Sequence, residues 1–168
     1  MILDYSKLVP GMVIGTTCLT SPLAAIIRFT TAGPRYVFSR LAASHIVIVV
    51  REHDLYYGME MTWPKIRQID LCDIDKYVVF YTADRTLTNY RMQDQCNEWL
   101  LKSHYIGVKY DWKELFKFWD MPVYDDPKRL ICSDLYREMC RCNKIPYPKK
   151  WNTKVSPWDI QKYYVRQS

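Results

Sequence analysis

The stretch SHIVIVV, residues 44–50, decides the fold, because it is the strongest strand signal in the chain. Residues 46–50 are all β-branched and apolar, and such side chains favour the extended backbone of a strand. An unbroken apolar run fits a strand that is covered on both faces, so we expect this strand to be central in its sheet. The run is far shorter than the roughly 18 apolar residues that a membrane-spanning helix needs.

The segments on either side of this strand predict a mixed architecture. The turn at 52–54 would fold residues 55–61 back against the central strand. Thr88 is expected to cap a helix and Gly107 to stop it. Further strands are predicted at 12–17, 66–71 and 77–81, the last two completing a meander, and helices at 22–30, 88–103, 112–119, 132–142 and from 157 onward. We therefore expect one α+β domain over residues 1–168, with roughly four to six antiparallel strands packed against helices.

Composition and charge limit the class of protein. The chain has 168 residues, 49% hydrophobic and 25% charged, as in globular proteins and unlike a disordered chain. Residues 141–168 hold seven of the 24 cationic residues and one of the 18 acidic ones, so this basic C-terminal segment carries the whole net charge of +6. We interpret it as a solvated surface, or as a contact for an acidic partner or an anionic surface. Its aromatic residues could stack on bases, but it has no nucleic-acid-binding motif, and we do not expect nucleic acid as a partner.

The spacing of the cysteines and the first residues of the chain indicate whether a metal site is expected and in which cellular compartment the protein is expected. The six cysteines include no CxxC pair, which disfavours a zinc site. The N-terminus lacks the basic and apolar regions of a secretion signal. We therefore expect a cytoplasmic protein with reduced thiols and no transmembrane segment, in the host cytoplasm if a phage or virus encodes it.

Three polar side chains stand at the ends of predicted elements. His45 opens the central strand, Glu60 lies near the end of the next strand, and Cys132 opens a helix. The N–H groups and dipole of a helix N-terminus stabilise a thiolate and can bind an oxyanion. A nearby imidazole can move the thiol proton to a leaving group, and a carboxylate can fix the imidazole tautomer. Spacing alone leaves an alternative open, in which all three residues are ordinary structural positions.

Three sets of segments, in this order, resemble a known enzyme superfamily. They are PGMVI at 10–14 with SHIVIV at 44–49; MEM at 59–61; and GVKYD at 107–111 with ICSDLY at 131–136. Together they resemble the circularly permuted YiiX/LRAT-like branch of the NlpC/P60 papain-like superfamily, in which the His precedes the Cys. The resemblance covers roughly residues 8–140 by motif order. It implies a permuted papain-like fold, although Met12 stands where the family usually has an acid.

The resemblance also implies roles for individual residues. Cys132 would be the nucleophile, His45 the base and Glu60 the acceptor that orients the imidazole. Tyr110 matches a family Tyr that lines the oxyanion site, and Ser133 follows the nucleophile in the same motif. No metal or organic cofactor is implied, because this set supplies nucleophile, base and oxyanion donors itself.

The resemblance leads us to expect a cysteine hydrolase that forms an acyl-enzyme on an amide or isopeptide bond. One alternative is a lipid or thioester acyl hydrolase, or an acyltransferase, on the same fold. A second alternative is a binding module without enzymatic activity that uses the basic aromatic C-terminal segment.

Overall fold

The computed structural model describes residues 2–18, 22–111 and 129–165, and its main element is a five-stranded antiparallel sheet. The sheet order is β4-β3-β2-β1-β5. The strands are β1 (Val13–Thr16), β2 (His45–Glu52), β3 (Leu55–Met61), β4 (Ile66–Ile69) and β5 (Val78–Thr82). The strand that begins at His45 is central, as its apolar run predicts, and the α+β class is confirmed. Two further strands, β6 (Lys109–Tyr110) and β7 (Arg129–Leu130), pair in parallel.

The β2–β3 hairpin is tighter than the sequence indicates. Its turn consists of His53 and Asp54, which have φ angles of 49° and 64°. Two successive left-handed residues match the twist of a two-residue hairpin. The turn fixes a register in which Val47 lies opposite Glu60.

The predicted meander is wrong for its last strand. β5 pairs with β1, at the opposite edge of the sheet from β4. Between them α2 (Leu71–Ile74), which Asp70 caps by accepting from the Cys72 N–H, carries the chain across one face of the sheet. Leu71 is buried there. Because this short helix packs on the sheet, β5 does not follow β4 as the next strand of a meander.

The longer helices are α1 (Pro22–Ala32), α3 (Tyr90–Ile106), α4 (Cys132–Cys142) and α5 (Pro157–Val165). α3 is capped by Asn89, which accepts from the Arg91 N–H, and not by Thr88. Gly107, at a φ of 73°, ends α3 as expected. The helix predicted at 112–119 lies outside the described residues. Short 3-10 turns lie at Tyr5–Lys7, Pro34–Tyr36, Asp75–Tyr77, Arg85–Thr88 and Lys149–Asn152.

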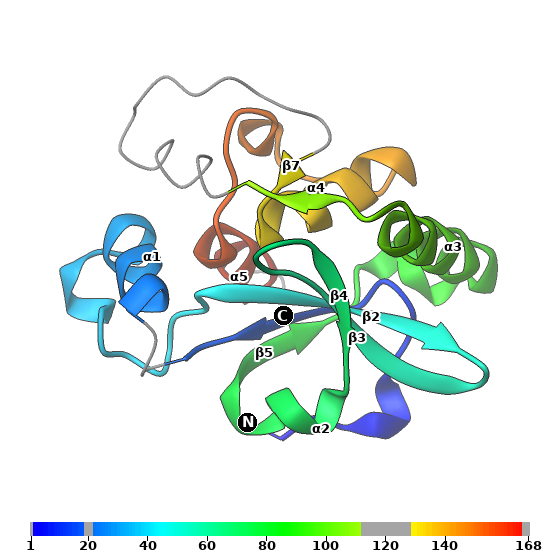
Figure 1. Ribbon diagram of the computed structural model, residues 1–168, viewed down its shortest axis with the longest axis horizontal. Coiled ribbons are helices and arrows are strands. Elements are labelled where there is room, and N and C mark those ends of the chain that lie inside the picture. The colour runs from blue at the N-terminus through cyan, green and yellow to red at the C-terminus, as the bar shows by residue number, and fades with distance from the viewer. Residues whose placement is uncertain (1, 19–21, 112–128, 166–168) are drawn as a thin grey trace.

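The helices are divided between the sides of the sheet (Figure 1). α3, α4 and α5 cover one face, and the N-terminal turn and α2 lie on the other. α4 packs directly on β2, which brings the start of the Cys132 helix to the start of the His45 strand. α1 lies to one side, at the end where β1 stops and β2 begins. Within the ranges described, no helix has the length and apolarity to cross a membrane.

The basic C-terminal segment is folded onto the helical layer up to residue 165. Trp151 is fully buried and stacks on Tyr147, and Tyr164 is nearly buried. Ser156 and Asp159 cap α5 reciprocally, each side chain accepting from the other's backbone N–H. These buried rings stabilise the core and are not available to stack on bases.

Candidate active site

The structure brings His45, Glu60, Tyr110 and Cys132 to one cleft of about 440 Å³. His45 is the first residue of β2, and Glu60 lies one residue before the end of β3. Cys132 is the first residue of α4, and Tyr110 ends β6. The cleft therefore forms where the start of a strand, the end of its neighbour and a helix N-terminus converge.

Glu60 holds the imidazole of His45 in place. The register sets Glu60 opposite Val47, two residues from His45, which is within reach of a diagonal contact. The Nε2 atom of His45 lies 2.8 Å from Oε2 of Glu60. Arg67 of β4, directly opposite Glu60 in the register, donates from Nε to Oε1 at 2.6 Å. Glu60 is only 5% exposed, and both of its carboxylate oxygens have a partner.

The pKa of His45 depends on its burial and on two neighbours, Cys132 and Glu60. Burial alone would lower the pKa of the imidazole. The interaction with Cys132, followed by the hydrogen bond and the charge of Glu60, outweighs burial and raises the pKa of His45 to about 10. Because Glu60 occupies Nε2, Nδ1 is the ring nitrogen that remains for the sulfur. The raised pKa favours an imidazolium at His45, in the cleft that Cys132 also lines.

Glu60 is the matching anion. Burial alone would raise the pKa of its carboxyl, but the hydrogen bonds and charges of His45 and Arg67 lower it overall. An ionised carboxylate at this position stabilises the imidazolium and keeps its ring orientation.

Cys132 is the first residue of α4 and therefore stands at a helix N-terminus. Ile131, the N-cap residue, makes no side-chain hydrogen bond to the first turn. The N–H groups of a first helical turn lack intrahelical partners, and their dipole favours negative charge. A thiolate of Cys132, or an oxyanion formed beside it, can use these donors.

Tyr110 and Ser133 are placed differently. Tyr110 is nearly buried and lines the cleft with Cys132. Burial, and then the charge of Cys132, raises the pKa of the Tyr110 phenol well above its ordinary value, so it stays a neutral O–H donor. The Ser133 hydroxyl is fully buried and donates to the Val155 carbonyl at 2.7 Å. Ser133 can therefore offer an oxyanion its backbone N–H, whereas its hydroxyl is already engaged.

Two arginines, one in the cleft and one that supports its wall, are not predicted from the sequence. One is Arg67; the other is Arg28 of α1, which is fully buried. Arg28 donates to the Val37 carbonyl at 2.7 Å, to Thr17 Oγ1 at 2.8 Å and to Ser44 Oγ at 3.3 Å. It thus ties α1 to the residue before His45. Pairing the strand that holds Glu60 with the next predicted strand could have placed Arg67 opposite Glu60. An Arg inside an apolar helix gives no comparable indication of its contacts.

The other two buried thiols have raised pKa values, which is unfavourable for a nucleophile. Burial raises the pKa of Cys96 to about 12, and it raises the pKa of Cys140 even further. Neither lines the cleft. Of the three buried cysteines, Cys132 is the one that lines the cleft together with His45.

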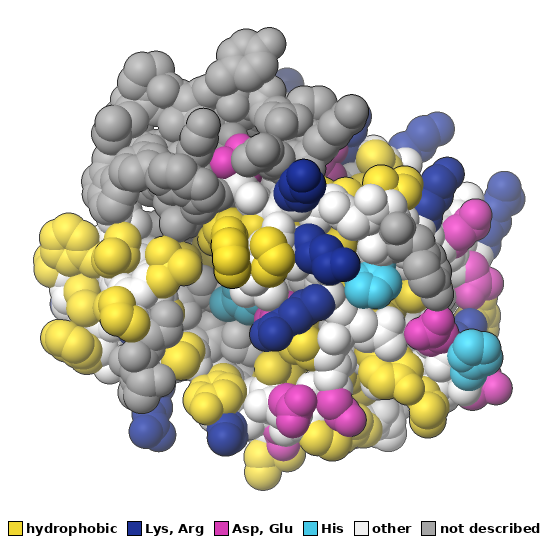
Figure 2. Space-filling view, viewed as in Figure 1, with side chains coloured by type: hydrophobic (Ala, Val, Ile, Leu, Met, Phe, Trp, Pro, Cys, Tyr) yellow, Lys and Arg dark blue, Asp and Glu magenta, His cyan; other side chains and the backbone are white. Residues whose placement is uncertain are grey.

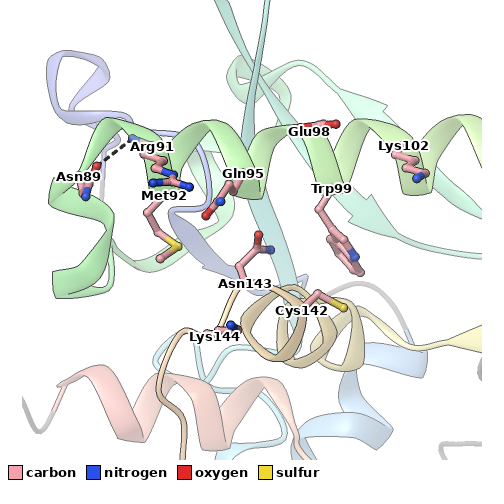
Figure 3. A pocket seen from close by; sticks show the side chains of 10 residues that line it. All are labelled: Asn89, Arg91, Met92, Gln95, Glu98, Trp99, Lys102, Cys142, Asn143 and Lys144. Carbon is pink, nitrogen blue, oxygen red and sulfur yellow. Dashed lines mark hydrogen bonds between the residues drawn. The ribbon is translucent and has the colours of Figure 1, made fainter.

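A second hollow, of about 580 Å³, lies between α3 and the C-terminal end of α4 (Figure 3). Trp99 points from α3 toward Cys142, and Arg91, Lys102 and Lys144 contribute positive charge. Its lining contains no residue of the predicted site and no carboxylate–imidazole pair. Its larger volume therefore does not make it the candidate active site.

Comparison with known proteins adds no assignment. No protein-family model matches this chain, and no curated protein matches its sequence.

Proposed function

We propose that this chain is a cysteine hydrolase that cleaves an amide or isopeptide bond through an acyl-enzyme on Cys132. The observation that carries the proposal is the 2.8 Å contact between His45 and Glu60 in a cleft that Cys132 also lines. A thiolate, an imidazolium and an orienting carboxylate in one cleft are the parts that nucleophilic acyl transfer requires. The motif order shared with the NlpC/P60 superfamily supports the same reading.

The proposed reaction has two steps. The Cys132 sulfur attacks the carbonyl carbon, and the oxyanion is bound by the first-turn N–H groups of α4 and by the Tyr110 hydroxyl. The carbon–nitrogen bond then breaks as the His45 imidazolium gives its proton to the departing amine. In the second step His45 takes a proton from water, which attacks the thioester and returns Cys132 to the thiolate–imidazolium pair.

An apolar cleft wall favours a second candidate on the same machinery. Leu23, Ala24 and Ile27 of α1 line the cleft, and so does Met61 at the end of β3. Such a wall fits an aliphatic acyl chain better than a charged peptide. A lipid ester or thioester could therefore be the acyl donor, with hydrolysis or transfer deciding the fate of the acyl-enzyme.

A binding module without enzymatic activity has less support, because Trp151 and Tyr164 of the C-terminal segment are buried. The testing experiment uses 4-nitrophenyl acetate as the acyl donor and locates the acetyl group by peptide mass spectrometry. The proposal expects a burst of nitrophenolate and an acetyl group on Cys132. The Cys142→Ser variant, which removes an exposed thiol, is the matched control and should keep the burst.

If the acetyl groups are spread over the exposed cysteines and Cys132 is not preferred, the proposed function is contradicted. A burst with the ester should then be compared with turnover of a peptide anilide and of an acyl thioester. Faster acylation by the anilide supports an amide substrate, and faster acylation by a long-chain thioester supports the second candidate.

A further inference from the structure

The outer face of α1 is apolar although its inner face is already buried against the protein. Ala24 and Ile27 face inward and are buried. Leu23, Ile26 and Phe29 point outward and are 44%, 44% and 53% exposed. A helix that is hydrophobic all round is normally covered on every side. The outer face of α1 is therefore exposed to solvent, although its composition is that of a buried surface.

The chain that follows α1 extends this apolar surface. Phe38 and Leu41 are 83% and 71% exposed, and the 3-10 turn before Phe38 packs on α1. Figure 2 shows hydrophobic side chains gathered over α1 at the left of the molecule. We call these five residues, Leu23, Ile26, Phe29, Phe38 and Leu41, the α1 surface. Contiguous exposed apolar side chains mark interaction sites.

The charged residues of the chain segment that forms this surface have one sign. The sequence contains no Asp or Glu between Asp4 and Glu52. Arg35 and Arg40, in the segment between α1 and β2, are both exposed. Apolar side chains flanked by arginines and free of acids in the same segment match the chemistry of an anionic bilayer surface.

The α1 surface is rigidly attached and lies beside the candidate active site. Arg28, on the inner side of the helix, is pinned by hydrogen bonds to Val37 and Thr17. Leu23 belongs both to the α1 surface and to the lining of the cleft. Whatever binds the α1 surface is therefore held at the mouth of the cleft.

We propose that the α1 surface docks this protein onto anionic lipid bilayers, with its apolar side chains in the interface and Arg35 and Arg40 at the headgroups. A second copy of the chain fits less well. A symmetric pair would bring the same patch and the same arginines together, and like charges across an interface are unfavourable. The proposal does not depend on the chemistry of Cys132, because docking requires no acyl transfer.

The test is co-sedimentation of the full chain with phosphatidylcholine vesicles that contain or lack phosphatidylserine. The wild type should bind the anionic vesicles, and added salt should weaken binding. Ile26→Ser/Phe29→Ser should weaken binding roughly tenfold or more, because two apolar side chains leave the interface. Arg35→Gln/Arg40→Gln should weaken it by about fivefold for each arginine removed. The matched control is Leu55→Ser/Ile106→Ser, whose residues are 59% and 71% exposed on other elements.

Binding by the control and by Cys132→Ala should equal that of the wild type. A wild type that stays in solution with anionic vesicles would overturn the proposal. So would a folded Ile26→Ser/Phe29→Ser protein, judged by circular dichroism, that binds like the control. If that variant does not fold, unchanged binding of Arg35→Gln/Arg40→Gln overturns the proposal. Self-association that depends on Ile26 and Phe29, without vesicle binding, also overturns it and identifies a dimer surface.

Discussion

The Nε2 atom of His45 lies 2.8 Å from Oε2 of Glu60, although the two residues are separated by a whole hairpin. The other oxygen of Glu60 is held by Arg67. The imidazole is thus oriented by a carboxylate that is itself fixed, and its second nitrogen is left to face Cys132. Preorganised groups of this kind do not need to rearrange when charge develops in a reaction.

Replacing Cys132 with Ser should lower the pKa of His45 substantially below about 10, because the interaction with Cys132 is the largest influence that raises it. The wild-type imidazole should stay protonated at pH 8, since its pKa lies above that pH. Nitrogen-detected NMR titration of the ring measures this directly, and the other two histidines, His53 and His104, provide reference signals. An unchanged His45 titration in Cys132→Ser would contradict the assigned coupling.

Tyr110→Phe separates oxyanion binding from nucleophile activation. Removal of one oxyanion donor commonly lowers the rate about 10²-fold. We expect a decrease of that order in acylation by 4-nitrophenyl acetate, with KM little changed. Alkylation of Cys132 by iodoacetamide forms no oxyanion and should keep its rate. Equal losses in both reactions would mean that Tyr110 acts only by packing.

Arg28→Met should destabilise the fold by roughly 2–4 kcal/mol, because it leaves the buried Thr17 hydroxyl and the Val37 carbonyl without their donor. Urea denaturation measures this loss. Arg51→Met is the control, since Arg51 contacts Asp94 near the surface at 3.3 Å, and exposed pairs contribute about 0–1 kcal/mol. Similar losses in the two variants would show that the buried network is not specially stabilising.

Asp159→Asn should cost about 1 kcal/mol at pH 7 through loss of the cap on α5. Burial would raise the pKa of Asp159, but the hydrogen bond from Ser156 and the charges of Lys162 and Lys150 lower it overall. A carboxyl whose folded pKa is below its unfolded value, near 3.9, stabilises the fold above that pH. That stabilisation is lost as the pH falls through the folded pKa.

The difference in stability between wild type and Asp159→Asn should therefore shrink as the pH is lowered from 7 to 3. Thermal melts at both pH values test this, with Ser156→Ala as the partner variant. A difference that stays constant with pH would mean that the Asp159 charge is not what caps the helix.

Parts of this arrangement could be predicted from sequence because they depend on local patterns. The apolar run at 46–50 indicated the central strand, and Cys132 at a predicted helix start indicated a thiol at a dipole. Other parts depend on tertiary packing. The pairing of β5 with β1 follows from where α2 packs, and the Arg67 contact follows from the register of β4.

The C-terminal segment shows the limit of composition most clearly. Its charge indicated a solvated surface or a contact for a partner, yet its aromatic residues build part of the core around Trp151. A net charge counts only the charged ends of side chains. The aliphatic stems of lysines and the aromatic rings of the same segment can still pack against the core. Conversely, the sequence predicted a helix at 22–30, and only the structure reveals that one apolar face of α1 is exposed.

The central claim is that Cys132 is activated by His45, and the pH dependence of its alkylation by iodoacetamide tests this most directly. Peptide mass spectrometry should follow all six cysteines together in wild type and His45→Ala. We predict that Cys132 reacts far faster than the other five below pH 7 and that His45→Ala abolishes this advantage. If Cys132 in the folded protein reacts no faster than exposed Cys72 and Cys142, the thiolate–imidazolium pair and the function built on it are contradicted.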